Sequence, residues 1–339
     1  MSLSKSKVSI SRRTAIKGAV AVPISFGILR LRNAQAQAVT MRVGSDSPMT
    51  SPHTASVIKL KEIVEAKTNG RIQVQIFPDG QVGSNDVMSN GVKAGSLDAV
   101  MTDVGAASQA VPQLGIFSVP FLFKGVQHTV RAANGAVGAK IKANFEKAYD
   151  CELLGWGTDG LRNMWDSKRP IRTPDDLKGL KMRVTASAVH QATFTVLGAL
   201  ATPVAYPEVY GALQSKVLDG ADLAISDMVA DKFYQVTKYM SDTGHFTMMD
   251  ALIVSNKFLA KLSDADKAIV REAGKAACTA EVEATIEGEK KGLGFIKGKG
   301  VEVIADIDLG PFKSKMGPVY ELAAKQVGQD LIDEAKRVA

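Results

Sequence analysis

The chain has 339 residues, 45% of them apolar, which is enough to bury one large hydrophobic core or two smaller ones. Its formal net charge is +7, but the first 38 residues carry seven Lys or Arg and no acid, so the remainder holds 35 basic and 35 acidic residues. No basic stripe remains, so the composition argues against a nucleic-acid partner. The two cysteines, Cys151 and Cys278, have no metal-type spacing and are expected to be buried free thiols.

The first 38 residues are predicted to be a targeting segment and not part of the fold. Basic residues precede an apolar stretch at 18–29, which is shorter than the ~20 residues of a membrane span. Small residues suited to cleavage follow at 34–38. Arg12 and Arg13 fit a twin-arginine leader, and the general secretory route is the alternative. The sequence therefore predicts export.

From residue 39, strands alternate with helices. Hydrophobic periodicity and end signals predict strands at 39–44, 72–76 and 98–102, and helices at about 53–67 and 84–94. Such alternation indicates a parallel sheet with right-handed crossovers. Ligands of these sheets bind at the carboxyl ends of the strands, which places Asp46 and Asp103 at the mouth of a cleft.

The rest of the chain is expected to form a second α/β unit and a long helix. Residues 111–125 are rich in Pro, Gly and Phe and are predicted to be a surface connection with one hydrophobic cluster. The second unit extends to about residue 246, and the apolar run at 247–254 leads back to the first unit. Ser263 and Asp266 form a capping box for a helix of some 25 residues, or ~37 Å, enough to brace two domains.

Two arginines are candidates for binding an anion. Arg183 lies in the short apolar strand 180–184, where a desolvated cation needs a negative partner. Arg162 follows a strand predicted at 152–158. A guanidinium can grip a carboxylate through two parallel hydrogen bonds. The alternative is that both are ordinary surface arginines with partners inside the protein.

An exported enzyme that acts on a small carboxylate is the alternative function. The sequence has no HExxH, paired CxxC or Gly-x-Ser-x-Gly motif, and Gly292 and Gly294 follow a helix, unlike the glycines of a dinucleotide-binding loop. Asp219 and Asp222 allow acid–base chemistry or a metal site, but a turn and helix cap is favoured. The four histidines are scattered along the chain, and His190 is expected to cap or pack. No catalytic residue and no cofactor are predicted.

Three blocks in order resemble the DctP-type solute-binding proteins of tripartite ATP-independent periplasmic (TRAP) transporters. The most specific motif is Lys178-Gly179-Leu180-Lys181-Met182-Arg183-Val184. The blocks comprise residues 70–72, 77–83 and 94–98, then 168–171 and 175–184, and then 202–214 and 217–222. The resemblance covers most of the chain after the leader.

This resemblance implies a two-domain α/β clamshell of the periplasmic-binding-protein type, with the long helix bridging the domains. Domain I is expected to comprise residues 39–160 and about 249–288, and domain II residues 161–248 and about 289–339. The implied protein is a periplasmic monomer that captures an organic acid in the cleft between the domains. It then delivers the acid to the membrane subunits of the transporter through a transient contact. It is not an enzyme.

The resemblance also assigns roles to individual residues. Arg183 matches the main carboxylate clamp of the family, and Arg162 matches an assisting arginine, which is expected at the rim of the cleft. Tyr206 matches a position that packs on the ligand. Three residues match polar positions of the first domain that reach across the cleft: Asp46, Asn85 and Asp103.

Three further positions bear on the kind of ligand. Trp165 is expected to add an aromatic wall. Leu223 replaces an asparagine that is frequent in the family, which suggests a smaller or more apolar acid than a sugar acid, or a shifted pose of the ligand. Asp222 matches an acidic position through which some relatives bind a metal, but those relatives lack an arginine at the position of Arg162, so no metal is predicted.

Overall fold

The computed structural model describes residues 38–338, so the predicted targeting segment lies outside the described residues except for Ala38. Across these residues, no helix combines the length and the apolar character needed to cross a membrane. One nine-stranded sheet runs through the described chain in the order β2-β1-β3-β8-β4-β7-β5-β6, with β9 beside β8. Its strands are β1 (Val39–Gly44), β2 (Ile72–Phe77), β3 (Ala99–Asp103), β4 (Cys151–Asp166), β5 (Lys181–Val184), β6 (Leu200–Pro203), β7 (Gly220–Leu223), β8 (Tyr239–Ser255) and β9 (Glu302–Ile304).

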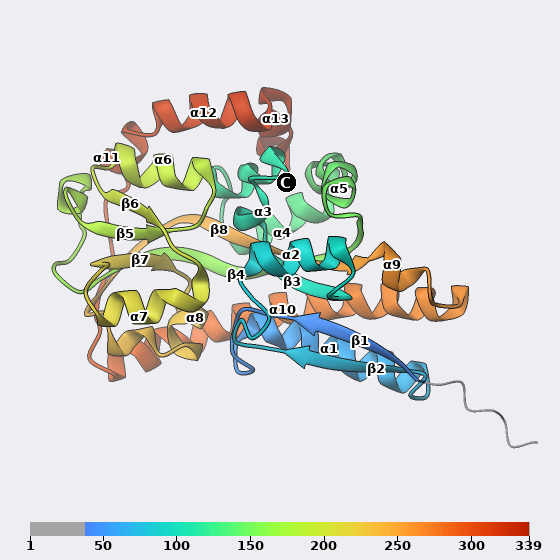
Figure 1. Ribbon diagram of the computed structural model, residues 1–339. Helices are drawn as coiled ribbons and strands as arrows, with labels where there is room; N and C mark the ends of the chain where they lie inside the picture. Colours follow the sequence, from blue (N-terminus) through green and yellow to red (C-terminus); the bar gives the residue numbers. More distant parts are fainter. Residues whose placement is uncertain (1–37, 339) are drawn as a thin grey trace, which may run out of the picture. The chain divides into compact units, whose positions relative to one another are not determined.

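Helices cover both faces of this sheet (Figure 1). The α-helices are α1 (Pro52–Lys67), α2 (Asn85–Ala94), α3 (Val104–Ala107), α4 (Val126–Asn134), α5 (Ala136–Tyr149), α6 (Ala188–Val196), α7 (Val209–Gln214), α8 (Ile225–Ala230), α9 (Asn256–Leu259), α10 (Asp264–Gly298), α11 (Gly310–Ser314), α12 (Gly317–Val327) and α13 (Gln329–Arg337). The short 3-10 helices are η1 (Pro112–Ser118), η2 (Pro174–Leu177), η3 (Tyr206–Glu208) and η4 (Phe233–Gln235).

The first half of the sheet has the predicted parallel arrangement. Strand β1 pairs in parallel with β2 on one side and β3 on the other, and β8 is antiparallel to β3. Alternate residues of β2 are buried, beginning with Ile72 and Val74, because one face of the strand packs on the core. The helix predicted at about 53–67 is α1, which buries Val57, Leu60 and Val64. The prediction for this segment is confirmed.

Strands β4 and β8 are long and hold the two halves of the sheet together. They pair antiparallel over most of their 16 and 17 residues, with three register shifts. The predicted end of β4 at residue 158 is wrong. Gly160 has a positive φ of 115° at one of the register shifts, so the chain passes through a bulge and continues as the same strand. The run 247–254 returns to the first half as part of β8, as expected.

The second half consists of parallel strands β5, β6 and β7 between α6 on one side and α7 and α8 on the other (Figure 1). Helix α10 starts at the predicted N-cap, where Ser263 accepts a hydrogen bond from the Asp266 backbone, but it has 35 residues where about 25 were expected. It contacts α1 and β4 of the first half and α8 of the second. Gly292 lets it approach α8, since a Cβ there would lie 2.5 Å from Ile225 Cγ2.

The segment 111–125 lies largely in the interior. The prediction of a surface connection there is wrong, because η1 is buried and packs against α6 and α12. Leu114, Ile116 and Phe117 are inaccessible there and belong to the largest hydrophobic cluster. Cys151 and Cys278 are buried free thiols, as predicted. The residue ranges proposed for two domains remain a prediction.

Candidate functional site

A cavity of about 150 Å³ lies between the two halves of the sheet. Four of the seven predicted ligand-binding residues line it: Asn85, Asp103, Arg183 and Tyr206. The other lining residues are Ser84, Asp86, Ala106, Thr185, Ala186, Pro203, Val204 and Ala205. The first half contributes the start of α2 and the β3–α3 junction, and the second half contributes the carboxyl ends of β5 and β6. The site therefore forms where the ends of strands from both halves meet, as in other open α/β sheets.

Arg183 is the main cation of this cavity. It is 4% exposed, its Nε donates to the Val204 carbonyl at 3.0 Å, and its guanidinium lies 5.9 Å from the centre of the Tyr206 ring. No carboxylate in residues 38–338 lies within 4.0 Å of the guanidinium, and so its terminal nitrogens have no anionic partner. Burial, followed by repulsion from Arg162, lowers the pKa of Arg183. An anion in the cavity would offset both effects.

The first half faces Arg183 with acidic and amide groups. Asp46, which follows β1, does not line the cavity; it lies beneath Asn85, whose Nδ2 donates to Asp46 Oδ2 at 2.5 Å. Asp103 caps α3 by accepting hydrogen bonds from the Gly105 and Ala106 backbones. Burial, followed by the negative charge of Asp159, raises the pKa of Asp103 to about 6. The carboxyl groups of this wall can accept hydrogen bonds, and the amide of Asn85 has both donor and acceptor atoms.

Arg162 does not lie at the rim, and that prediction is wrong. Its side chain is 1% exposed because β4 continues through it, and it contacts the carboxylates of Asp222, Asp227 and Asp159 at 3.5, 3.8 and 3.9 Å. It also donates to the Asp222 carbonyl. Burial opposes the charge, but Asp222, Asp227 and Asp159 together raise the pKa of Arg162. The alternative of internal partners holds for Arg162, although the residue is not on the surface.

Asp222 is the centre of this buried polar group. His190 Nε2 and His245 Nε2 lie 3.0 and 3.2 Å from Asp222 Oδ2. Because the Thr185 backbone N–H donates to His190 Nδ1, a neutral His190 must carry its proton on Nε2, facing Asp222. Burial opposes ionisation of Asp222, but His190 and Arg162 together hold its pKa well below the usual range.

Two of the four histidines, His190 and His245, thus meet at Asp222, and His190 packs against Phe194 and Phe246, as expected. The expected turn or helix-cap role of Asp222 is wrong, because Asp222 lies within β7. The sequence had no signal for this cluster, because 55 residues separate His190 from His245. The pairing of β4 with β7 and β8 brings Arg162, Asp222 and His245 together, and α6 adds His190.

Trp165 is not a wall of the cavity. Its side chain is fully buried in the hydrophobic cluster of the second half, and its Nε1 donates to the Leu223 carbonyl at 2.8 Å. Leu223 packs in the same cluster and does not line the cavity. The apolar residue at position 223 therefore packs in the core of the second half.

Asp231 lies next to the cavity wall, and no sequence motif pointed to it. The Tyr206 hydroxyl donates to Asp231 Oδ2 at 2.6 Å, and this contact fixes the ring that lies beside Arg183. Burial raises the pKa of Asp231 to about 7. Its position, 25 residues beyond Tyr206, gave no local signal for the contact.

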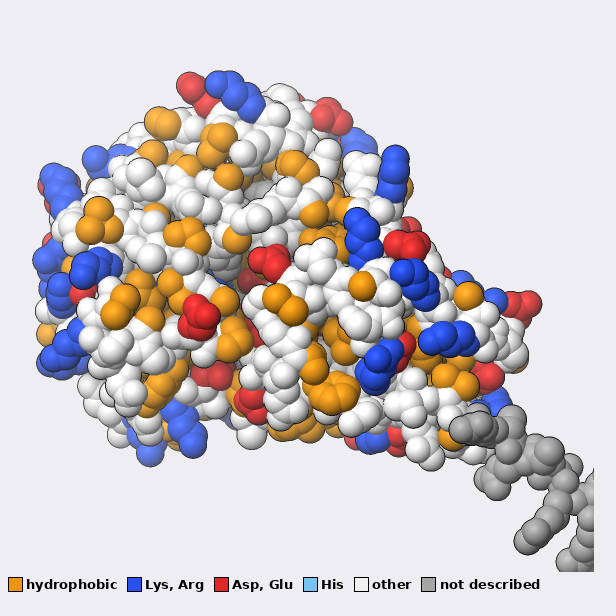
Figure 2. Space-filling view, in the orientation of Figure 1, with side chains coloured by type: hydrophobic (Ala, Val, Ile, Leu, Met, Phe, Trp, Pro, Cys, Tyr) orange, Lys and Arg blue, Asp and Glu red, His pale blue; other side chains and the backbone are white. Residues whose placement is uncertain are grey.

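Charged side chains are unevenly distributed on the face shown in Figure 2: several red acidic side chains lie near its centre, and blue basic side chains lie along its left edge and over its right-hand part. A second set of polar groups, His53, Asp159 and Asp250, has donor atoms that all lie within 4.8 Å of one another and could hold a metal ion. These residues lie outside the lining of the cavity.

A mixed α/β sheet whose halves meet at a polar cavity with a buried, unpaired arginine defines the class of solute-binding proteins. Residues 43–326 match the family model DctP, described as bacterial extracellular solute-binding protein, family 7. The chain belongs to this family.

Known members are similar along most of their length. A TRAP periplasmic solute-binding protein from Polaromonas sp. JS666, bound to D-erythronate, is 32% identical with a TM-score of 0.85, over 88% of this chain and 99% of that one. One from Roseobacter denitrificans, with bound β-D-glucuronate, is 27% identical with a TM-score of 0.83, over 88% and 100%. The 2,3-diketo-L-gulonate-binding periplasmic protein YiaO of Escherichia coli is 29% identical over 92% of this chain and 96% of its own.

Proposed function

We propose that this protein captures a small hydroxylated organic acid in the cavity and delivers it to the membrane subunits of a TRAP transporter. The observation that carries the proposal is Arg183, a buried guanidinium that faces a cavity and has no carboxylate partner in residues 38–338. A guanidinium with unused donors in a water-poor site is suited to bind a carboxylate through two hydrogen bonds.

The lining of the cavity indicates the kind of acid that it can bind. Opposite the guanidinium, Ser84, Asn85 and Asp103 can exchange hydrogen bonds with hydroxyl groups. The relatives from Polaromonas and Roseobacter hold erythronate and glucuronate, and the E. coli relative is named for 2,3-diketo-L-gulonate, all of which are acids with hydroxyl groups. A relative from Sulfurospirillum deleyianum holds succinate, which has none. Our expectation of a hydroxy acid therefore rests on the polar wall of Ser84, Asn85 and Asp103.

We place this capture in the periplasm, with a leader at residues 1–38 that directs export. The support is the membership in an extracellular binding-protein family and the periplasmic relatives. Closure of the two halves around the acid would present a surface to the membrane subunits. A ligand can favour that closed state only as far as it binds it more tightly than the open state.

Titration of Arg183 variants tests the carboxylate clamp. Hydroxy acids, led by erythronate and glucuronate, are first screened by thermal shift, and the best one is titrated by calorimetry. Arg183→Ala is expected to weaken binding by ~2–5 kcal/mol, or roughly 30- to several thousand-fold. Arg183→Lys should recover little, because an ammonium cannot reproduce the bidentate geometry.

Arg71→Ala is the matched control, since Arg71 is half-exposed, pairs with Asp266 and lies away from the cavity. It should bind as the wild type does. Ligand-free melting temperatures establish that each variant is folded. If Arg183→Ala binds within about threefold of the wild type, the carboxylate does not dock on Arg183.

The same samples separate binding from catalysis. Mass spectrometry after prolonged incubation should recover the acid unchanged, as expected for a transport protein. Conversion of the acid by the wild type, and not by Arg183→Ala, would instead support the alternative of an exported enzyme.

A further inference from the structure

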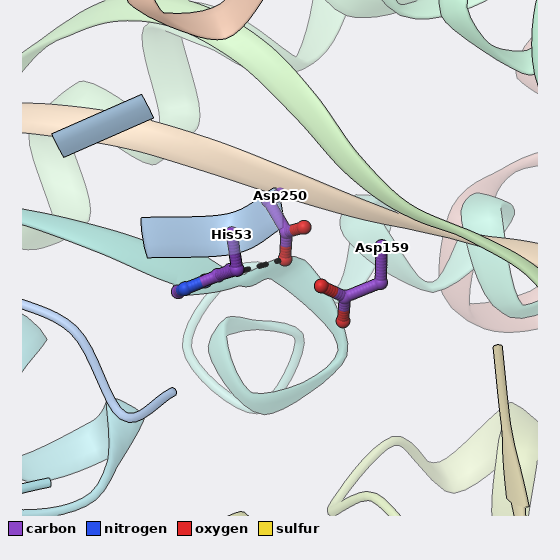
Figure 3. Close-up of side chains that lie close together, drawn as sticks. All are labelled: His53, Asp159 and Asp250. Carbon is purple, nitrogen blue, oxygen red and sulfur yellow. Dashed lines mark ion pairs between the residues drawn. The ribbon is translucent and has the colours of Figure 1, made fainter. Parts of the chain in front are cut away.

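Three side chains from distant parts of the chain form a compact group outside the cavity. His53 lies in the first turn of α1, Asp159 lies in β4 and Asp250 lies in β8. One donor atom from each lies within 4.8 Å of the other two, and His53 Nε2 is 3.9 Å from Asp250 Oδ1. In Figure 3 the carboxyl group of Asp159 points toward His53 and Asp250. His53 and Asp250 are 2% and 0% exposed.

The hydrogen bonds around His53 determine which nitrogen carries its proton. The Thr54 hydroxyl donates to the Ser47 carbonyl at 3.0 Å, so in its 2.9 Å contact with Ser45 Oγ it must accept. Ser45 therefore uses its one proton on Thr54 and can only accept from His53 Nδ1, at 3.0 Å. Nδ1 carries the proton, and in a neutral imidazole Nε2 presents its lone pair to Asp250. A ring held in this way by its other nitrogen is typical of a metal-binding histidine.

Asp250 is a buried carboxyl group, and neither of its oxygens meets a nitrogen or hydroxyl donor among the described residues. It faces the carboxyl group of Glu281 in α10, and burial raises the pKa of both groups, so that they can share a proton when no other cation is bound. Gly157 is the cross-strand neighbour of Asp250, and a Cβ on Gly157 would lie 2.0 Å from Glu281 Oε2. The Glu281 carboxyl group thus occupies the space of a missing side chain beside Asp250. A lone pair on Nε2 and carboxyl oxygens facing one another are unfavourable unless a proton or a metal ion lies between them.

The nearest protein cation does not supply that charge. Arg162 approaches only Asp159, at 3.9 Å, and it is shared with Asp222 and Asp227. We propose that His53, Asp159 and Asp250 bind a first-row divalent metal ion, with Glu281 available as a further oxygen ligand. A set of one imidazole and two or three carboxylates suits Zn²⁺ or Mn²⁺, whereas Mg²⁺ and Ca²⁺ prefer oxygen ligands alone. This site is separate from the Asp222 position, for which the sequence argued against a metal.

Calorimetric titration with ZnCl₂ and MnCl₂ tests the site without any organic acid. The purified protein, stripped with a chelator, should bind one equivalent of at least one of these ions and should melt at a higher temperature in its presence. His53→Gln and Asp250→Asn should each weaken binding at least ~100-fold. Ser45→Ala removes only the group that orients the imidazole and should weaken binding by ~10- to 100-fold.

His128→Gln is the matched control, because His128 is a buried histidine of α4 that bonds to the Lys124 backbone and lies outside the group. It should bind metal as the wild type does. Asp250→Asn keeps the size of the side chain, and its amide can still donate a hydrogen bond to Glu281, so the metal-free variant should melt close to the wild type. This melting temperature shows whether the variant is folded. Absence of metal binding by the wild type would overturn the proposal, and so would equal binding by the wild type, His53→Gln and Asp250→Asn.

Discussion

Arg162 and Arg183 lie 21 residues apart and are both buried, but their guanidinium groups have different partners. Arg162 neutralises acids of its own protein, and Arg183 faces the cavity without such a partner. The difference arises because Arg162 sits among Asp222, Asp227 and Asp159. A sequence motif can identify both arginines, but it cannot show which of them is already paired.

Arg162→Ala should therefore act mainly on stability. Removal of the cation leaves buried carboxylates uncompensated, which we expect to lower the free energy of unfolding by ~3–5 kcal/mol. Urea denaturation without ligand measures this effect. Arg71→Ala, which breaks the surface pair with Asp266, should lower it by less than about 1 kcal/mol. Equal stability of the Arg162 and Arg71 variants would contradict the assignment.

Asp103 should make stability depend on pH. Burial and Asp159 raise its pKa to about 6 in the folded protein, against ~3.9 in an unfolded chain. At pH values between these two pKa values, Asp103 is ionised in the unfolded state and protonated in the folded state. The free energy of unfolding therefore falls as the pH rises from ~4 to ~6. The loss is complete above this window and amounts to about 3 kcal/mol, at ~1.4 kcal/mol per unit of pKa.

Asp103→Asn removes this effect and can still cap α3, since Asn is an equally good N-cap residue. The variant should be more stable than the wild type at pH 8 and should have no such advantage at pH 4. Asp175→Asn, at an exposed carboxylate, is the control and should show no comparable gain. Chemical denaturation at the two pH values provides the measurement, and a gain of equal size at both would rule out the ionisation of Asp103 as its cause.

At the scale of elements, β4 and α10 depend on glycines where they approach one another. Gly157 and Gly160 of β4 and Gly274 of α10 each leave no room for a Cβ, which would lie within 2.5 Å of a side-chain atom of the other element. These contacts bring the long helix directly onto the long strand, and so they fix Glu281 beside Asp250. The packing of these two elements thereby positions the polar groups between the halves of the sheet.

Gly157→Ala should destabilise the protein by ~1–3 kcal/mol, because the added methyl group overlaps the Glu281 carboxyl group. Addition of Glu281→Ala should recover part of this loss, since it removes the group with which the methyl collides. Gly211→Ala is a matched control in α7, where a Cβ meets nothing within 4 Å; there we expect unchanged or slightly increased stability. Additive effects of the Gly157 and Glu281 substitutions in a double-mutant cycle would argue against direct contact.

At the scale of the whole molecule, the cavity exists only because two α/β units share one sheet through β4 and β8. Each half supplies one wall, so neither half alone can enclose a ligand. The family to which the chain belongs uses such an arrangement for transport. Delivery also requires that the protein is exported to the compartment where the ligand is found. We assign this export to residues 1–38.

Variants of the leader test the export proposal. Removal of residues 1–38 should leave a folded protein, because the hydrophobic clusters and the nine-stranded sheet lie within residues 39–338. Replacement of Arg12 and Arg13 by Lys in the full chain should abolish export through the twin-arginine route. The amount of the wild type and of the double variant in the periplasmic fraction measures export. Undiminished export of the double variant would indicate the general secretory route instead.

The sequence by itself determined the local features and the class of protein. Period-two and helical patterns predicted β1, α1, β2, α2 and β3, because each pattern depends on residues close together in the chain. The motif around Arg183 pointed to the family, which the match over residues 43–326 confirms.

The places where distant polar residues meet depend on the tertiary structure. Asp222 lies beside Arg162 and His245 because β4 pairs with both β7 and β8, and the packing of α6 adds His190; no local pattern records these contacts. The bulge at Gly160 carries Arg162 into the interior, and the packing of β4 in the core buries Trp165 away from the cavity. His53, Asp159 and Asp250 are each about 90 to 110 residues from the next, so their proximity depends entirely on the assembly of α1, β4 and β8.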